Sequence, residues 1–236
     1  MYKLPFYIGH IVSCFVPGRE RRRRVRGKIN VFLYRIPIAR FIKKTYGVRA
    51  RTIKFVRQVS MNRMTCVVND RYYVKIFRDV SVKQLNDYKF LLDWIRPKLN
   101  VQIPDIYVAK HIPMYVADRL PGKDMRDFDA KQIIKHENKI KSQVIDTIDA
   151  MQHIPVKKIP GYKRFISGLQ NKNTNVKLGA GAVLAHLDLN ASNLLLDDKF
   201  NVVSIVDWDS LSIVPKSNID RDSFENLWDI YKKSHK

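Results

Sequence analysis

Cysteine is scarce in this chain, and its two cysteines are far from each other and from any cluster of histidines. Cys14 and Cys66 lack the spacing of metal ligands, and only one of the six histidines, His186, stands within a motif. Neither a disulfide framework nor a structural zinc site is indicated, because the first needs several cysteines and the second needs closely spaced Cys and His ligands. We expect a protein of the reducing cytoplasm.

Long hydrophobic runs are also missing. The longest apolar stretch near the start, Pro5 to Val16, carries His10 and is too short to cross a bilayer, which takes about 20 residues. Most of the charge follows this stretch, whereas a secretory signal carries its charge in front. Any contact with a membrane would be peripheral, at the inner face of the cell membrane.

Acidic residues are few, and they are scarcest at the N-terminus. The chain has 44 Lys and Arg against 22 Asp and Glu, a formal net charge of +22. Residues 1–57 contain 16 of the basic residues and a single acid, Glu20. An anionic partner is expected at this end of the chain.

The first 50 residues are predicted to form a basic amphipathic extension. Arg21 to Arg24 and Arg26 form a polybasic cluster, and apolar residues then recur at helical spacing: Phe32, Leu33, Ile36, Ala39 and Ile42. Pro37 is expected to kink or restart this helix. Contact with an anionic membrane surface or glycolipid is the first interpretation, and a helix packed on the fold is the second. Nucleic acid is the third, because no nucleic-acid-binding motif accompanies the charge.

The most informative motif is HLDLNASNLLLD, His186 to Asp197, followed by IVDWD, which ends at Asp209. It places Asp188 and Asn193 in the spacing His-x-Asp-x-x-x-x-Asn of a kinase catalytic loop. Transfer of a phosphoryl group from ATP needs a carboxylate that orients the attacking hydroxyl and oxygen ligands that hold Mg²⁺. We expect Asp188 to be the base, with Asn193 and Asp207 as the Mg²⁺ ligands.

A hairpin is expected to join these residues. The short apolar run 194–196 reads as a strand, a turn follows at Asp197 and Asp198, and the run 201–206 reads as a second strand that leads to Asp207. A hairpin with polar turns and no catalytic role is the alternative. The second carboxylate at the end of the paired strand favours the catalytic interpretation.

The residues before this motif read as a nucleotide-binding lobe, 51–118. Three strands are expected at 53–59, 64–68 and 71–77, and Lys75 in the third is the candidate that holds the nucleotide phosphates. The loop between the first two strands has no glycine, so phosphate contacts would come from Ser60, Asn62 or backbone N–H groups. The helix expected at 82–95 contains no glutamate to pair with Lys75, and Asp87 is the best substitute.

A second lobe is expected to occupy 119–236. The segment 114–125 reads as a strand followed by a Pro-Gly turn, and backbone groups at Ala117, Asp118 and Arg119 would bind the adenine. One long amphipathic helix is expected at 130–153.

The order of these motifs resembles the aminoglycoside phosphotransferase and choline kinase group of kinase-like enzymes. The catalytic stretch also resembles lipopolysaccharide core kinases, including the Kdo kinases, which phosphorylate sugars of a lipid-anchored glycan. The resemblance covers about 53–210 and is most specific at Asp188, Asn193 and Asp207. It implies an α+β, two-lobed protein-kinase-like fold with a small β-rich N-lobe and a mainly helical C-lobe.

Departures from the kinase pattern narrow the substrate class. Leu187 replaces an arginine common in protein kinases, and Trp208 and Asp209 replace the Phe-Gly after the metal aspartate. Only 27 residues follow Asp209, which argues against a protein kinase and puts aminoglycosides in doubt. We expect an ATP- and Mg²⁺-dependent kinase for a small-molecule hydroxyl or a sugar on a membrane-displayed glycolipid. The alternative is a pseudokinase that binds nucleotide or anionic lipid as an interaction module.

Overall fold

The computed structural model describes residues 3–60, 62–165, 181–216 and 219–234. Internal contacts divide the chain into two compact units. Unit 1 comprises residues 1–89 and 105–119, and unit 2 comprises residues 90–104 and 120–236. The expected fold class, α+β with a β-sheet N-terminal part and a mainly helical C-terminal part, is confirmed.

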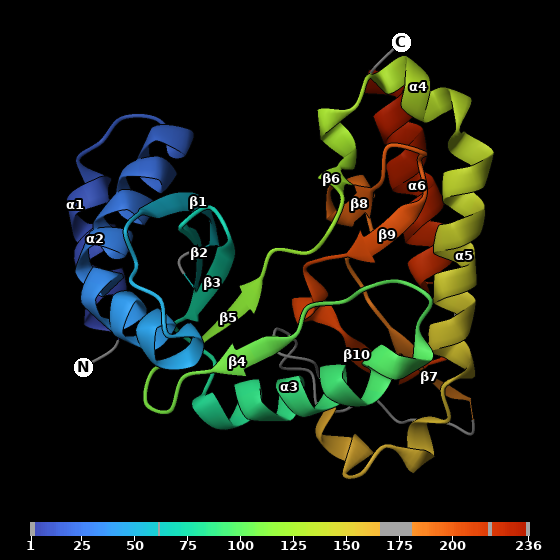
Figure 1. Ribbon diagram of the computed structural model, residues 1–236. Helices are drawn as coiled ribbons and strands as arrows, with labels where there is room; N and C mark the ends of the chain where they lie inside the picture. The colour runs from blue at the N-terminus through green and yellow to red at the C-terminus, as the bar shows by residue number, and fades with distance from the viewer. Residues whose placement is uncertain (1–2, 61, 166–180, 217–218, 235–236) are drawn as a thin grey trace. The chain divides into compact units, whose positions relative to one another are not determined.

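Unit 1 is built on a five-stranded antiparallel sheet (Figure 1). Its spatial order is β1-β2-β3-β5-β4, and its strands are β1 (Ile53–Ser60), β2 (Arg63–Val68), β3 (Tyr72–Phe77), β4 (Ile106–Val108) and β5 (Met114–Asp118). Burial alternates along β2, as a strand with one buried face requires. Asn69 and Asp70 both have positive φ and close the tight turn between β2 and β3. The three strands expected from the sequence are confirmed.

Two N-terminal helices, α1 (Leu4–Cys14) and α2 (Arg19–Tyr46), belong to the same unit as this sheet (Figure 1). They share one hydrophobic core with it, to which α1 contributes Phe6, α2 contributes Tyr34, Ile38 and Ile42, and the sheet contributes Met64 among others. Helices α1 and α2 therefore pack with the sheet.

Pro37 was expected to kink or restart the helix, and the helix does not restart, because Pro37 lies inside α2. Packing of α2 against the sheet helps to offset the lost backbone hydrogen bond. Of the apolar residues that recur at helical spacing, Ile42 is buried, whereas Phe32, Leu33 and Ile36 are exposed. The residues that are buried are Gly27, Asn30, Val31, Tyr34, Ile38 and Ile42.

Gly27 allows α2 to approach the sheet closely. A Cβ atom at this position would lie 2.2 Å from the ring of Phe55 on β1, far inside van der Waals contact. Only glycine lets helix and strand approach this closely. The buried face of α2 thus combines Gly27 and Asn30 with larger apolar residues, and hydrophobic spacing alone does not reveal these two.

Unit 2 is mainly helical. It receives the end of α3 (Val82–Ile95), which begins in unit 1, and contains α4 (Ala130–Lys135), α5 (Glu137–His153) and α6 (Ile219–Ser234). The helix expected at 130–153 is interrupted at His136, where ψ is 14°, so the single-helix prediction was wrong. The His136 ring stacks on Phe200, with 4.2 Å between ring centroids. This contact helps to hold the break.

Two small sheets complete unit 2. One pairs β7 (Ala182–Ala185) with β10 (Ser212–Pro215), and the other has the order β6-β8-β9, with β6 (Lys123–Asp124), β8 (Leu194–Leu196) and β9 (Val202–Ile205). Short 3₁₀ turns connect the elements: η1 (Arg96–Lys98), η2 (Met125–Asp127), η3 (Val156–Lys158), η4 (Tyr162–Phe165), η5 (Ala191–Asn193) and η6 (Trp208–Ser210). No helix within the described residues is long and apolar enough to span a membrane.

Candidate functional site

The hairpin of β8 and β9 brings the two expected metal ligands to the same end. Leu194 pairs with Ile205, and the N–H of Val206 donates to the carbonyl oxygen of Asn193 over 2.9 Å. Asn193 immediately precedes β8, and Asp207 follows Val206. The backbones of Asn193 and Asp207 therefore lie side by side, as the sequence predicts.

Asp188 is tied to this end of the hairpin through its own backbone. The side-chain amide of Asn193 donates to the Asp188 carbonyl oxygen over 2.7 Å. Asn190 donates to the same carbonyl over 3.0 Å and to the Asp188 carboxylate over 3.1 Å. The Asp188 side chain is half-buried. Its carboxylate is thus oriented by hydrogen bonds while part of it stays accessible to a reacting hydroxyl.

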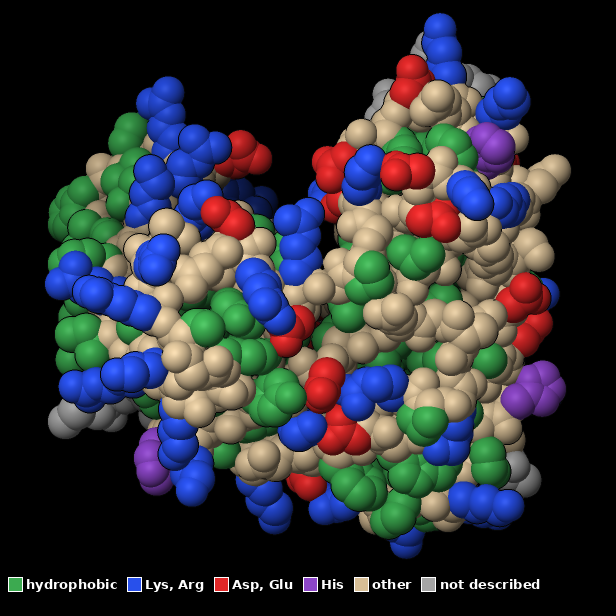
Figure 2. Space-filling model, viewed as in Figure 1, with side chains coloured by type: hydrophobic (Ala, Val, Ile, Leu, Met, Phe, Trp, Pro, Cys, Tyr) green, Lys and Arg blue, Asp and Glu red, His purple; other side chains and the backbone are tan. Residues whose placement is uncertain are grey.

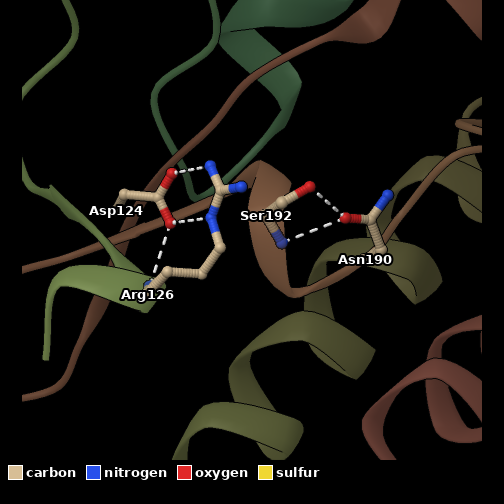
Figure 3. A network of polar contacts seen from close by, with 4 residues as sticks. All are labelled: Asp124, Arg126, Asn190 and Ser192. Carbon is tan, nitrogen blue, oxygen red and sulfur yellow. Dashed lines mark hydrogen bonds and ion pairs between the residues drawn. The ribbon is translucent and has the colours of Figure 1, made fainter. Parts of the chain in front are cut away.

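The turn between Asp188 and Asn193 is closed by a residue that the sequence analysis did not single out. The Oδ1 atom of Asn190 accepts from the N–H of Ser192 over 3.0 Å and from its hydroxyl over 2.6 Å (Figure 3). These bonds make Asn190 the N-cap of η5. The Asn-x-Ser spacing is the local signal that predicts such a turn.

His186 is a scaffold residue of this loop. It is fully buried, its Nδ1 lies 3.3 Å from the N–H of Asp188, and its Nε2 lies 3.3 Å from the carbonyl oxygen of Val206. These partners require a neutral ring with the proton on Nε2. Burial lowers the pKa of His186, and the nearby carboxylates of Asp220, Asp188 and Asp207 oppose this shift. The imidazole therefore orders the loop through backbone hydrogen bonds.

Two residues of the loop have a positive φ, which is unusual for a leucine and less so for an aspartate. Leu187 has φ 61° and Asp207 has φ 59°, in the left-handed region. Such conformations cost on the order of 1–3 kcal/mol each and persist only where the surroundings enforce them. After Asp207 the chain enters η6, where the buried Trp208 donates from Nε1 to the Ile205 carbonyl oxygen over 2.8 Å. The strain is therefore located at the two ends of the candidate site.

The donor set fits a magnesium ion bound together with nucleotide. Asp207 offers a carboxylate and Asn193 an amide oxygen, both hard ligands, and Mg²⁺ usually takes one or two protein carboxylates and completes its shell with phosphates and water. Within the described residues there is no group of three or more His, Cys, Asp or Glu that could hold a metal alone. Phosphate oxygens would therefore have to complete the coordination.

A basic side chain is held beside η5. The turn η2 packs against η5, and Arg126 of η2 is paired with Asp124 of β6, from its Nε to Oδ1 over 2.8 Å (Figure 3). The hydrogen bond to Asp124 raises the pKa of Arg126. Arg126 therefore remains a cation next to the turn that carries Asn193. No sequence motif predicts that Arg126 lies beside η5, because this position depends on how β6 pairs with β8.

Unit 1 carries the expected nucleotide-binding residues. Lys75 lies in the interior of the sheet on β3, paired with Thr65 on β2 and Tyr115 on β5, and its Nζ is 5.9 Å from the centroid of the Tyr115 ring. Asn62 lies in the β1–β2 turn, where its carbonyl oxygen accepts from the N–H of Arg78. The side chain of Ser60 lies outside the described part of the structure.

Part of the expected adenine-binding segment is already paired with β3 or hydrogen-bonded to the turn before it. Ala117 is buried in β5 between β3 and β4. The Asp118 carboxylate accepts from Nε of Arg71 over 3.0 Å, and the N–H of Arg119 donates to the Arg71 carbonyl oxygen over 2.9 Å. The Arg119 N–H is therefore already used within the fold.

No family model matches this sequence, and no curated protein is similar to it at a significant level. Solved structures are similar in fold. Wild-type aminoglycoside 2'-phosphotransferase-IIIa in complex with GDP gives a TM-score of 0.60 at 14% identity, covering 85% of this chain and 82% of that one. Macrolide 2'-phosphotransferase MphH from Brachybacterium faecium gives 0.56 at 10% identity, covering 84% and 81%. The streptomycin–ATP complex of APH(2")-IIa gives 0.51 at 12% identity, covering 76% and 72%.

These similarities establish the fold. The chain has the kinase-like architecture of small-molecule phosphotransferases, and the expected resemblance to the aminoglycoside phosphotransferase group is confirmed at that level. Sequence identities of 10–14% carry no residue roles.

Proposed function

We propose that this protein is a phosphotransferase that uses ATP and Mg²⁺ to phosphorylate a hydroxyl group. The observation that carries the proposal is the loop in which Asp188, Asn193 and Asp207 meet. Asn193 donates to the Asp188 backbone and shares the open end of the hairpin with Asp207. A positioned carboxylate next to two oxygen ligands is the minimum set for transfer to an alcohol. The kinase-like fold supports the same conclusion.

Each residue has a distinct part in this proposal. The Asp188 carboxylate orients the acceptor hydroxyl and takes up its proton as the oxygen attacks the γ-phosphorus, while the bond from that phosphorus to the β–γ bridging oxygen breaks and ADP leaves. Asn193 and Asp207 would hold the Mg²⁺ that neutralises charge on the nucleotide phosphates. Lys75 on β3 would bind the phosphates, with further contacts from Ser60 and Asn62. The backbone from Ala117 to Arg119 would bind the adenine.

The acceptor that we propose is a hydroxyl of a sugar displayed on an anionic membrane glycolipid. The support comes from unit 1, where α1 exposes Leu4, Tyr7 and Ile11 and where Phe15, at its C-cap, continues this apolar stripe with 86% of its surface exposed. Lys and Arg side chains gather over the same unit (Figure 2). Apolar insertion combined with basic charge is the usual composition of a peripheral membrane contact. The alternative acceptor for the same reaction is a hydroxyl of a soluble small molecule.

The decisive experiment measures phosphate transfer from labelled ATP to candidate acceptors. Asp188→Asn should lower turnover by roughly a hundredfold or more and leave nucleotide affinity within a few fold, because only the acid/base group is lost. Asp198→Asn is the matched control, since Asp198 is an exposed turn residue paired with Lys123. Equal losses of binding and turnover in Asp188→Asn would instead indicate a structural role.

A second candidate function is a pseudokinase that binds nucleotide or anionic lipid without transfer. The observation in its favour is that α3 contains no glutamate to pair with Lys75. It predicts MgATP binding with no phosphorylated product from any acceptor extract, and an Asp188→Asn variant that behaves as the wild type. Measurable turnover that depends on Asp188 would exclude it.

A further inference from the structure

Unit 1 contains a groove between α2 and β1 that the proposed phosphoryl transfer does not use. Its volume is about 1160 Å³, larger than the ~300–1,000 Å³ of most small-molecule sites. The lining residues fall into two groups, one basic and one apolar, and none of them is acidic. We call this feature the α2–β1 groove.

The basic group is dense and lacks anionic partners. It consists of Arg24, Lys28, Arg35 and Arg40 on α2, and Arg49 and Arg51 on the segment before β1. In the part of the chain that the structure describes, none of these six cations pairs with a carboxylate. Elsewhere in unit 1 such pairs do form, as between Lys54 and Asp70 over 2.8 Å. Concentrated unpaired charge of one sign favours an anionic ligand.

The apolar lining residues are unusually exposed for large hydrophobic side chains. Phe32 is 59% exposed, Ile36 is 54% exposed and Val56 is 50% exposed, and all three line the groove. Val31 and Ile53 continue this surface inward, since Val31 is buried and Ile53 is partly buried. Contiguous exposed apolar surface bordered by charge marks a binding site for a ligand with an apolar part.

We propose that the α2–β1 groove binds one molecule of an anionic phospholipid. The phosphate of its headgroup lies among the arginines, and its acyl chains lie on Phe32, Ile36 and Val56. The match is one of charge and polarity, because the six cations complement the phosphate and the aliphatic lining complements the chains. This binding needs neither nucleotide nor Asp188, so it stands independently of phosphoryl transfer.

Single-stranded nucleic acid is the competing anionic ligand, and the lining disfavours it. Such ligands stack their bases on aromatic side chains. The ring of Phe55 is packed over Gly27, where a Cβ would come within 2.2 Å of it. Phe32 is then the single exposed aromatic side chain among the lining residues, and one ring is too few to stack successive bases. Most of the remaining apolar lining is aliphatic, and it suits acyl chains better than bases.

The test uses the full chain without nucleotide and a short-chain phosphatidylglycerol below its micellar concentration, so that monomeric lipid is the probe. Calorimetric titration should show saturable binding. Phosphatidylcholine of the same chain length, glycerol phosphate and a single-stranded oligonucleotide should each bind at least about tenfold more weakly, because each lacks the net negative charge or the acyl chains.

Matched variants locate the site. Arg35→Glu with Arg40→Glu reverses two groove cations and should weaken lipid binding at least about tenfold. Arg22→Glu with Arg23→Glu makes the same charge change on exposed positions of α2 outside the groove and should stay within about twofold. Ile36→Ser should weaken binding, and Ile11→Ser on the α1 stripe should not.

Three results would each overturn the proposal. Equal losses in the two double variants would mean that diffuse charge attracts the lipid and that the groove does not bind it. Glycerol phosphate binding as tightly as the lipid would mean that the apolar lining is unused. Tighter binding of the oligonucleotide, lost on Arg35→Glu with Arg40→Glu, would assign the groove to nucleic acid. Circular dichroism of each variant confirms that the substitutions at these exposed positions leave the fold intact.

Discussion

The carboxylate of Asp220 accepts a hydrogen bond over 2.7 Å from the backbone N–H of His186, 34 positions earlier in the chain. Its other oxygen accepts from the N–H of Leu187 over 2.8 Å. Asp220 is 2% exposed and lies in the first turn of α6. One buried carboxylate at a helix N-terminus thus holds the start of the candidate catalytic loop, including Leu187 with its positive φ.

Asp220→Asn should therefore destabilise the protein by about 1–3 kcal/mol, because an amide replaces one of the two acceptor oxygens with a donor that faces an N–H group. Turnover should fall further than nucleotide binding, since the loop positions Asp188. Chemical denaturation and steady-state kinetics measure the two effects. Asp222→Asn is the control, because Asp222 is exposed in the same turn of α6. Equal small effects in both variants would show that the contact does not hold the loop.

Asp207→Ala should lower Mg²⁺-dependent nucleotide binding by at least about tenfold, because it removes the single carboxylate of the candidate metal set. Alanine also fits poorly at φ 59°, so Asp207→Asn serves as the companion variant. Asparagine tolerates the left-handed region and removes only the charge. Calorimetry with and without Mg²⁺ measures the effect. If MgATP binding is unchanged in both variants, the metal assignment is wrong.

Gly9→Ala should destabilise unit 1 by about 1–3 kcal/mol through overpacking, more than the ~1 kcal/mol that alanine gains in helix propensity. The added Cβ would lie 2.3 Å from Oδ1 of Asn30, a fully buried residue of α2. Cys14→Ala, at an exposed position of the same helix, should be near neutral. Asn30→Ala should partly rescue Gly9→Ala in thermal unfolding, because it removes the colliding amide. Absence of coupling between the two would contradict the close helix contact.

The two thiols should react at very different rates. Burial raises the pKa of Cys66 to about 12, so almost no thiolate is available near neutral pH, whereas Cys14 is exposed. A thiol reagent should therefore modify one cysteine of the native protein quickly. The second should react only as fast as the protein unfolds, and both should react at once in denaturant. Rapid modification of both in the native state would contradict the burial of β2.

Ile11→Ser with Phe15→Ser should weaken binding to vesicles that contain phosphatidylglycerol, because each apolar CH₂ removed from the contact is worth about 0.8 kcal/mol. Binding of the wild type should also fade with salt, since the Debye length falls from about 10 Å at 0.1 M to about 3 Å at 1 M. Co-sedimentation measures both effects. Ile230→Ser on α6 is the control, as Ile230 is 60% exposed outside unit 1. No binding by the wild type at low salt would end the membrane hypothesis.

Local patterns predicted the elements whose side chains report directly on their structure. The three strands β1 to β3, the helix Val82–Ile95 and the β8–β9 hairpin all have a regular spacing of apolar residues and clear turn residues. Asp188 was identified as a candidate because four residues separate it from Asn193, the spacing of a kinase catalytic loop. These features depend on interactions within a few residues of the chain.

What the sequence did not predict depends on contacts between distant segments. The buried face of α2 includes Gly27 and Asn30, whose small or polar side chains carry no hydrophobic signal. His136, at the break between α4 and α5, stacks on Phe200, and the contact of Asp220 with the loop depends on how α6 packs. No spacing rule links such pairs, because only the assembled core brings them together.

The antiparallel ladder of unit 1 has a mechanical consequence. Phe55 of β1 pairs with Cys66 of β2, and Thr65 of β2 pairs with Lys75 of β3, so the wall of the α2–β1 groove and the candidate phosphate lysine are two strand pairings apart. A ligand that shifts β1 would act on the same hydrogen-bonded ladder that positions Lys75. By linkage, any increase in nucleotide affinity caused by a groove ligand must be matched by an equal increase in affinity for that ligand when nucleotide is bound.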